Sequence, residues 1–322
     1  MKLTNLLSVL VISISAHCAE LSTPAYEDID FPDGEPASKL EIQLGRVLFF
    51  DPRLSSNFQQ SCATCHNPDL GFADGLSKSR GVLGKVLDRH TPHLINVAFA
   101  SVLHWGGEVE SLEKQVLKPI TAKTEMNLPI SELITRLAGV PYYVEQFDEL
   151  YGKKGLNSTN LAKAIAAFER TIISNNSAFD RYIAGELSAL SPAQIRGLGL
   201  FKNKAGCVAC HDGANFTDDS FHNTGVSTDD PGRYLVFADE TLKYAFKTPG
   251  LRNVAHTAPY MHDGSLASLE QVIEFYDRGG GKTKNKDRLI KPLHLTALEK
   301  SDLLAFLGSL SSHIDTRRPE IP

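Results

Sequence analysis

The chain contains Cys62-Ala63-Thr64-Cys65-His66 and, 145 positions later, Cys207-Val208-Ala209-Cys210-His211. Both stretches have the form C-x-x-C-H, which is the attachment site of a c-type haem. The two thiols add to the two vinyl groups on one edge of a porphyrin, so they must lie about one helical turn apart. The next residue, a histidine, gives an imidazole nitrogen to the iron. The sequence therefore predicts two covalent haems whose proximal ligands are His66 and His211.

Two C-x-x-C pairs can also form a single zinc site. Zinc pairs usually lie closer together in the sequence, and they need no histidine directly after each pair. The zinc alternative is therefore weaker than the haem interpretation, because it does not explain why a histidine follows each cysteine pair.

Composition is typical of a globular protein. The chain has 322 residues, of which 42% are hydrophobic and 22% charged, and its net charge of −5 gives no indication of nucleic-acid binding. Four of the five cysteines belong to the haem sites, so no disulfide framework is expected. We expect a mainly α protein with two cytochrome c-like haem domains and long loops, one over residues 19–175 and one over 176–322.

The first residues resemble a secretory signal. Met1-Lys2-Leu3 is a charged start, and residues 6–14 form an apolar run that is too short to span a bilayer. Cleavage after Cys18 would remove a signal peptide of residues 1–18, whereas a lipoprotein would retain Cys18 and carry a lipid on it. His17 is a poor residue before a lipidated cysteine, so we expect a periplasmic protein with no membrane span.

Helical periodicity and capping residues predict the regular structure. Ser38-Lys39-Leu40-Glu41 is a capping box that opens a helix. Further helices are expected over 111–118, 131–138, 141–151, 159–174, from Pro192 onward, 268–276 and 296–310, and few stretches have the pattern of strands.

The two haem sites have similar surroundings. Gly45-x-x-Leu48-Phe49 precedes the first site and Gly197-x-x-Leu200-Phe201 precedes the second. Phe72-Ala73-Asp74 follows the first and Phe216-Thr217-Asp218 follows the second. Because the similar segments come in the same order around both sites, we expect an internal duplication of one helical haem-binding unit.

The segments between and after the haem sites resemble the di-haem cytochrome c peroxidase/MauG family over nearly all of the mature chain. The resemblance rests on Thr91-Pro92-x-Leu94, Trp105, Ser111-Leu112-Glu113-x-Gln115, Glu125-Met126, residues 246–253 and residues 259–265. It implies a peroxide-reacting haem on His66 and a second haem on His211 that stores or relays the oxidising equivalent.

The same resemblance implies roles for single residues. Glu125 would be the distal acid/base that moves a proton between the peroxide oxygens, which is chemistry a carboxylate can perform. Gln115 would orient the distal site and Pro119 would help to wall it. Trp105, the only tryptophan, would carry electrons or holes between the haems, although a lone tryptophan can also be a core residue.

The far ligand of the second haem divides the family. Counting seven residues from Leu269 reaches Tyr276, as in MauG-like enzymes, where bacterial peroxidases have a methionine. Tyrosinate stabilises high-valent iron, whereas methionine stabilises ferrous iron. The alternative ligand, Met261, is in the wrong register.

No histidine lies in the loop 81–87, where many bacterial peroxidases carry a distal ligand of the first haem. A five-coordinate first iron is therefore expected, with His104 as the remaining candidate ligand. The segments 89–92 and 274–280 favour the group of MauG and the methanobactin-associated enzymes called MbnH.

The resemblance also implies a calcium ion between the domains, bound partly by the backbone carbonyls of Thr257 and Pro259. Two departures stand out. His90 replaces the usual asparagine ligand of calcium, and Gly106-Gly107-Glu108 after Trp105 replaces the usual Asp-Gly-Arg, which puts the local salt bridge in doubt. With no second tryptophan, Tyr234 or Tyr244 would have to relay holes to the surface.

Three functions follow as alternatives. The first is a MauG/MbnH-type enzyme that uses hydrogen peroxide to form a high-valent di-haem state and oxidises a residue, typically tryptophan, of a secreted or periplasmic protein. The second is a peroxidase that takes electrons from a small redox protein. The third is a di-haem electron carrier without enzymatic activity.

Overall fold

The computed structural model describes residues 20–32 and 34–322, so the expected signal peptide and Cys18 lie outside the described residues. The fold is mainly α-helical, as the sequence predicts. Its α-helices are α1 (Lys39–Phe50), α2 (Cys62–Cys65), α3 (Leu112–Thr121), α4 (Ile130–Ala138), α5 (Pro141–Tyr151), α6 (Ser158–Glu169), α7 (Ala178–Ile183), α8 (Pro192–Lys202), α9 (Tyr234–Phe237), α10 (Leu269–Asp277) and α11 (Ala297–Gly308).

Short 3-10 helices fill many of the connections. They span Tyr26–Asp28, Pro52–Leu54, Pro68–Leu70, Val82–Gly84, Val97–Phe99, Leu187–Ala189, Cys207–Ala209, Glu240–Leu242 and Val254–His256. The described strands are β1 (Phe221–His222) and β2 (Phe246–Lys247), which pair antiparallel. No helix in the described part of the chain is long and apolar enough to cross a membrane.

Most predicted helices are present, with two corrections at their ends. The helix expected over 159–174 ends at Glu169, where Arg170 forms the C-cap and β-branched residues follow. Conversely, α3 continues past residue 118 and includes Pro119. The Ser38 hydroxyl caps α1 by accepting from the Glu41 backbone N–H at 3.1 Å.

The packing of helices repeats between the two halves. Helix α1 crosses α6 at Gly45, where a Cβ would collide with the backbone of Ala164. Helix α8 crosses α11 at Gly197, where a Cβ would collide with the backbone of Asp302. Both glycines therefore allow the same close helix crossing, which supports the predicted duplication.

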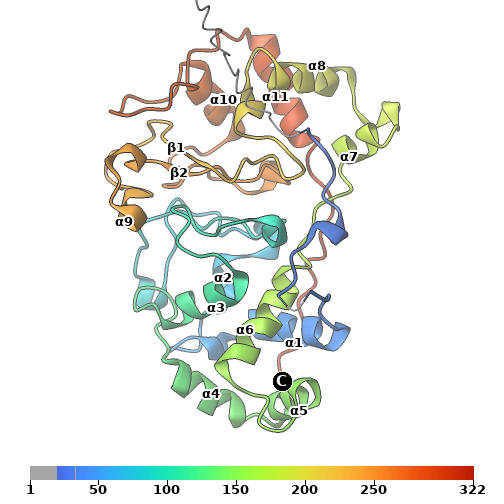
Figure 1. Cartoon of the computed structure of the whole chain (residues 1–322), viewed down its shortest axis with the longest axis vertical. Helices are drawn as coiled ribbons and strands as arrows, with labels where there is room; N and C mark the ends of the chain where they lie inside the picture. Colours follow the sequence, from blue (N-terminus) through green and yellow to red (C-terminus); the bar gives the residue numbers. More distant parts are fainter. Residues whose placement is uncertain (1–19, 33) are drawn as a thin grey trace, which may run out of the picture.

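Figure 1 shows two helical halves, one with α1 to α6 and one with α7 to α11. Each half has a large hydrophobic cluster, and a small third cluster contains Leu103, Val109, Leu112 and Ala166. One large cluster contains buried residues from Leu44 to Ile172 and the other buried residues from Phe179 to Leu310. The C-terminal tail returns to the first half, where Asp315 pairs with Arg46 at 3.0 Å. The predicted domain boundaries at 19–175 and 176–322 remain a prediction.

A second repeat links the halves, at a constant spacing of 157 positions. Thr91-Pro92-His93-Leu94-Ile95-Asn96-Val97-Ala98 corresponds to Thr248-Pro249-Gly250-Leu251-Arg252-Asn253-Val254-Ala255. Asn96 and Asn253 both have left-handed backbone, with φ of 58° and 55°, and both begin a 3-10 helix. The repeat continues into α3 and α10, which Ser111 and Ser268 cap in the same way.

Candidate haem and peroxide site

One cavity of about 1200 Å³ lies between the two halves and receives both C-x-x-C-H stretches. This volume exceeds that of an ordinary small-molecule pocket, which is roughly 300–1,000 Å³. Every residue predicted for the site lines it: Cys62, Cys65, His66, Trp105, Gln115, Pro119, Glu125, Cys207, Cys210, His211, Thr257, Pro259 and Tyr276.

The two proximal histidines are held in the same way. His66 Nδ1 lies 3.2 Å from the Phe72 carbonyl oxygen, and His211 Nδ1 lies 2.9 Å from the Phe216 carbonyl oxygen. Such a bond fixes the ring and leaves Nε2 to face a metal. Burial lowers the pKa of His66 to about 4 and also lowers the pKa of His211, so both rings are neutral and can donate a lone pair.

The cysteines fit covalent attachment rather than zinc. Burial raises the pKa of the Cys65 and Cys207 thiols to about 12, which disfavours the thiolates that zinc requires. Among the described residues, no cluster of metal ligands joins the two cysteine pairs. The donor set therefore fits two haems, each held by its own C-x-x-C-H stretch.

The residues expected beside the first haem, Glu125, Gln115 and Pro119, all line the cavity. Burial raises the pKa of Glu125, so its carboxyl holds a proton to a higher pH than an exposed glutamate does. Its backbone carbonyl accepts from Val82 N at 2.7 Å, within the loop 81–87 that lacks a histidine. His104 Nε2 bonds to Gln115 Oε1, so this ring nitrogen already has a partner.

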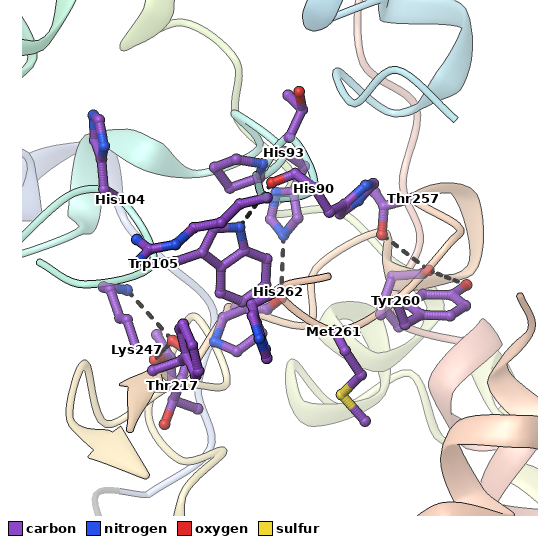
Figure 2. A pocket seen from close by; sticks show the side chains of 18 of the residues that line it. His90, His93, His104, Trp105, Thr217, Lys247, Thr257, Tyr260, Met261 and His262 are labelled. Atoms are coloured by element: carbon purple, nitrogen blue, oxygen red, sulfur yellow. Dashed lines mark hydrogen bonds between the residues drawn. The ribbon is translucent and has the colours of Figure 1, made fainter. Parts of the chain in front are cut away.

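Trp105 lies where the halves meet. Its indole N–H donates to the His90 carbonyl at 2.8 Å, and its ring meets His262 edge to face, with centroids 6.5 Å apart (Figure 2). His262 stacks in turn on Phe246, with centroids 3.6 Å apart. A contiguous set of aromatic rings therefore leads from Trp105 into the second half.

Tyr276 lies on α10 and lines the cavity near the second attachment site, where the charges of Cys207 and Cys210 act on its phenol. Burial, and then these two cysteines, raise the pKa of the phenol far above its usual range. A ferric iron would supply a positive charge that stabilises the phenolate. Met261, the alternative ligand, also lines the cavity and has left-handed backbone with φ of 74°.

Pro119 and Tyr276 occupy equivalent positions of the second repeat. Each lies eight residues after its capping serine, Ser111 or Ser268, and the two are 157 positions apart. Tyr276 brings a phenol oxygen to its end of the cavity, whereas proline has no donor atom in its side chain. Helix α10 thus presents a group that can bind iron, whereas the equivalent position of α3 presents none.

The predicted calcium ligands fit a calcium ion only in part. Calcium prefers oxygen ligands. His90 Nδ1 lies 2.7 Å from the Leu76 carbonyl oxygen, so this ring is committed to the backbone. The Thr257 hydroxyl already donates to the Val254 carbonyl, at 3.2 Å.

The sequence reasoning missed two charged groups at the site. Arg89 binds Asp230 at 2.6 Å and Glu108 at 3.0 Å, so it forms the local salt bridge that the sequence put in doubt. His222 lies between Asp287, at 2.6 Å, and Asp218, at 2.9 Å. In the sequence these ion pairs are visible only as single charged residues near the motifs, with nothing that indicates which residues pair.

Hydrogen bonding to the Cys210 sulfur, and also to Asp287 and Asp218, raises the pKa of His222 to about 10. Once the Cys210 sulfur is bound to haem as a thioether, the carboxylates of Asp218 and Asp287 remain as the groups that favour the protonated ring.

Comparisons with known proteins place the chain in a family. Residues 39–188 match the family described as di-haem cytochrome c peroxidase. The methylamine utilization protein MauG of Methylorubrum extorquens is 40% identical over 290 residues, which cover 89% of this chain and 82% of that protein. Cytochrome c551 peroxidase of Pseudomonas aeruginosa is 34% identical over 302 residues, covering 90% and 84%.

A solved structure supports the same assignment. The crystal structure of a MauG-like protein associated with microbial copper homeostasis superposes with a TM-score of 0.83 at 32% identity, covering 88% of this chain and 92% of that one. The chain belongs to the di-haem cytochrome c peroxidase family, and it is a peroxidase-type oxidoreductase with haem c cofactors.

Proposed function

We propose that this protein uses hydrogen peroxide to oxidise a residue, most simply a tryptophan, of a secreted partner protein. The observation that carries the proposal is the contrast between Pro119 and Tyr276 at equivalent positions of the repeat. When bound, the haems take oxidising equivalents from peroxide and hold them. Pro119 would offer no ligand to the first iron, whereas Tyr276 would offer the second iron an anionic phenolate suited to storage of an oxidising equivalent.

Glu125 acts as the base and acid of the first site. Its carboxylate accepts a proton from hydrogen peroxide and returns it to the departing oxygen, which leaves as water. Gln115, held by His104, orients the peroxide. Pro119 closes the wall beside them without offering a ligand.

Trp105 would carry holes between the two haems. Its N–H donates to a backbone carbonyl, which is not a base, so the oxidised indole keeps its proton. Electron transfer through Trp105 therefore needs no coupled proton movement. The Trp105 ring contacts His262, and His262 stacks on Phe246. Tyr244 precedes Phe246 by two residues, so it is the next oxidisable ring along this route.

Tyr244 is the better of the two tyrosines for a relay toward a partner. It lies beside β2, and Lys243 Nζ stands 5.8 Å from its ring centroid and 5.2 Å from that of Tyr234. A nearby ammonium disfavours a hole on either ring. Tyr234 lies on α9, ten residues before Tyr244 and so farther in sequence from Phe246. It would therefore extend the route after Tyr244 rather than begin it.

The partner is proposed to be a periplasmic protein. Haem c is attached outside the cytoplasm, and the start of the sequence predicts export. The MauG-like relative is associated with microbial copper homeostasis, which supports a copper-handling protein as the partner. A calcium ion between the halves would have to use the backbone carbonyls of Thr257 and Pro259 together with water, without His90.

A second candidate is a peroxidase that takes electrons from a small redox protein, which the similarity to cytochrome c551 peroxidase supports. Two measurements separate the candidates. The first is the absorption and EPR spectra of the fully oxidised holoprotein before and after one equivalent of peroxide, and the second is the rate of peroxide turnover with a reduced cytochrome. The proposal expects a high-spin ferric haem at rest and a long-lived oxidised state without reductant. Fast turnover with a reduced cytochrome favours the second candidate. Two low-spin haems that ignore peroxide would leave only electron carriage.

A further inference from the structure

The contact between the halves has approximate two-fold symmetry. His90 N donates to the His262 carbonyl at 2.8 Å, and Lys247 N donates to the Trp105 carbonyl at 2.8 Å. Lys247 follows His90 by 157 positions, and His262 follows Trp105 by the same number. Each repeat therefore gives the other the same backbone hydrogen bond, as in an isologous interface.

Within this contact, the two equivalent side chains differ in their hydrogen bonding. The Trp105 indole N–H has a partner, the His90 carbonyl. The His262 side chain is only 4% exposed, yet its Nε2 atom has no hydrogen-bond partner among the described residues. Buried polar atoms are almost always paired, so this nitrogen points to a group that the protein chain does not provide.

The His262 ring cannot easily turn to find another partner. It stacks on Phe246 with an angle of 11° between the planes, and Trp105 packs against it at 72° (Figure 2). Its Nε2 must therefore be satisfied from the cavity, which His262 lines.

The charged groups that act on His262 are Asp263, Asp230, Arg89 and Lys78. Arg89 is already engaged by Asp230 and Glu108. Lys78 lines the cavity from an exposed position, whereas His262 offers a buried ring nitrogen without a partner among the described residues.

Haem c retains two propionate carboxylates after its vinyl groups have reacted, and a buried carboxylate requires hydrogen-bond donors. His93 adds no second donor. Its Nε2 lies 3.2 Å from the Gly250 carbonyl and so carries the one proton of the neutral ring, which leaves Nδ1 as an acceptor. The donor that the contact between the halves offers to a carboxylate is therefore His262 Nε2.

We propose that His262 Nε2 donates a hydrogen bond to a haem propionate and so anchors that haem beside Trp105. This role requires only the bound haems that the family implies, and it stands whether or not the protein reacts with peroxide.

The test uses the ferric holoprotein at rest, read by resonance Raman spectroscopy in H₂O and D₂O. In the natural protein, a propionate bending band is expected to shift on exchange, because its donor proton exchanges. His262→Leu should lose this shift and His262→Gln should retain it, since an amide N–H replaces the imidazole N–H. His256→Leu, an exposed histidine on a neighbouring 3-10 helix, is the control and should leave the band unchanged.

An unchanged band and isotope shift in His262→Leu would overturn the proposal. Loss of a low-spin bis-histidine signal in that variant would also overturn it, because His262 would then be an iron ligand. If His262→Leu fails to retain haem, the natural protein and His262→Gln decide the matter. If neither the natural protein nor His262→Gln shows an isotope shift of the propionate band, the hydrogen bond from His262 is excluded. If both show the shift, the hydrogen bond is supported.

Discussion

Trp105 and His262 occupy equivalent positions of an internal repeat, and their rings meet edge to face where the two halves join. The centroids are 6.5 Å apart and the planes are inclined at 72°. One repeat thus contributes an oxidisable indole and the other an imidazole, so the two halves of a duplicated protein have taken different tasks at the same place.

Pro119→Tyr should give the first haem the ligand that its equivalent helix gives the second. We expect the high-spin ferric signal to be lost and the reaction with peroxide to slow by at least about tenfold, because the open coordination position is filled. EPR and stopped-flow absorption measure both effects. Pro119→Ala is the control and should remain high-spin; a high-spin Pro119→Tyr protein with natural rates would refute the equivalence.

Tyr276→Met should shorten the lifetime of the peroxide-oxidised state by roughly tenfold, because a thioether stabilises reduced iron rather than oxidised iron. The decay of the absorption spectrum after one equivalent of peroxide measures this lifetime. Tyr260→Phe serves as the control, since the Tyr260 hydroxyl donates to the Val254 carbonyl at 2.9 Å. If the oxidised state survives Tyr276→Met unchanged, Tyr276 is not the ligand.

Glu125→Gln should slow the formation of the oxidised state by roughly two to four powers of ten, the usual worth of a general acid/base. The amide keeps the shape of the side chain but cannot accept the proton. Stopped-flow mixing with excess peroxide gives the rate, and haem content with the resting spectrum shows whether the site is intact. A natural rate in this variant would remove Glu125 from the mechanism.

The reaction with peroxide should also depend on pH through Glu125. Burial raises the pKa of this carboxyl, so its proton-accepting form is lost as the pH falls through that raised value. We therefore expect the rate to be constant at higher pH and to decrease below a midpoint higher than that of an exposed glutamate. Glu125→Gln should abolish this limb of the profile, and its persistence there would assign the titration to another group.

Gly197→Ala should destabilise the second half by roughly 1–3 kcal/mol, because the new methyl group collides with the backbone of Asp302 where α8 crosses α11. Gly199→Ala on the same helix meets nothing within 4 Å and should instead stabilise by about 0.5–1 kcal/mol. Thermal unfolding of the holoproteins compares the two. Equal effects of both substitutions would contradict the close crossing.

Much of the site could be predicted because its chemistry depends on local spacing. A haem attached through Cys62 and Cys65 with His66 below it needs only five consecutive residues, and the same holds for Cys207, Cys210 and His211. Helix caps such as Ser38 and the repeat of Ser111 and Ser268 are equally local, since a cap bonds to a backbone N–H three residues away.

The two errors in the predicted helix ends have different causes. Helix α6 ends at Glu169 rather than at residue 174, and the β-branched residues 171–173 that follow have a lower helix propensity. Helix α3 runs through Pro119, although a proline in a helix interior costs about 3 kcal/mol. There tertiary packing overrides the local preference.

The sequence by itself determined the two haem attachment sites, the helical fold and the duplication, because covalent geometry and periodicity are written in short stretches of the chain. Only the tertiary structure decided that Arg89 pairs with Glu108 and Asp230, that His222 lies between two carboxylates, and that the buried nitrogen of His262 lacks a partner. These contacts join residues that are up to 141 positions apart. No local pattern selects such partners, since the energy that pairs them arises only when the packed halves bring their charges and polar atoms out of water.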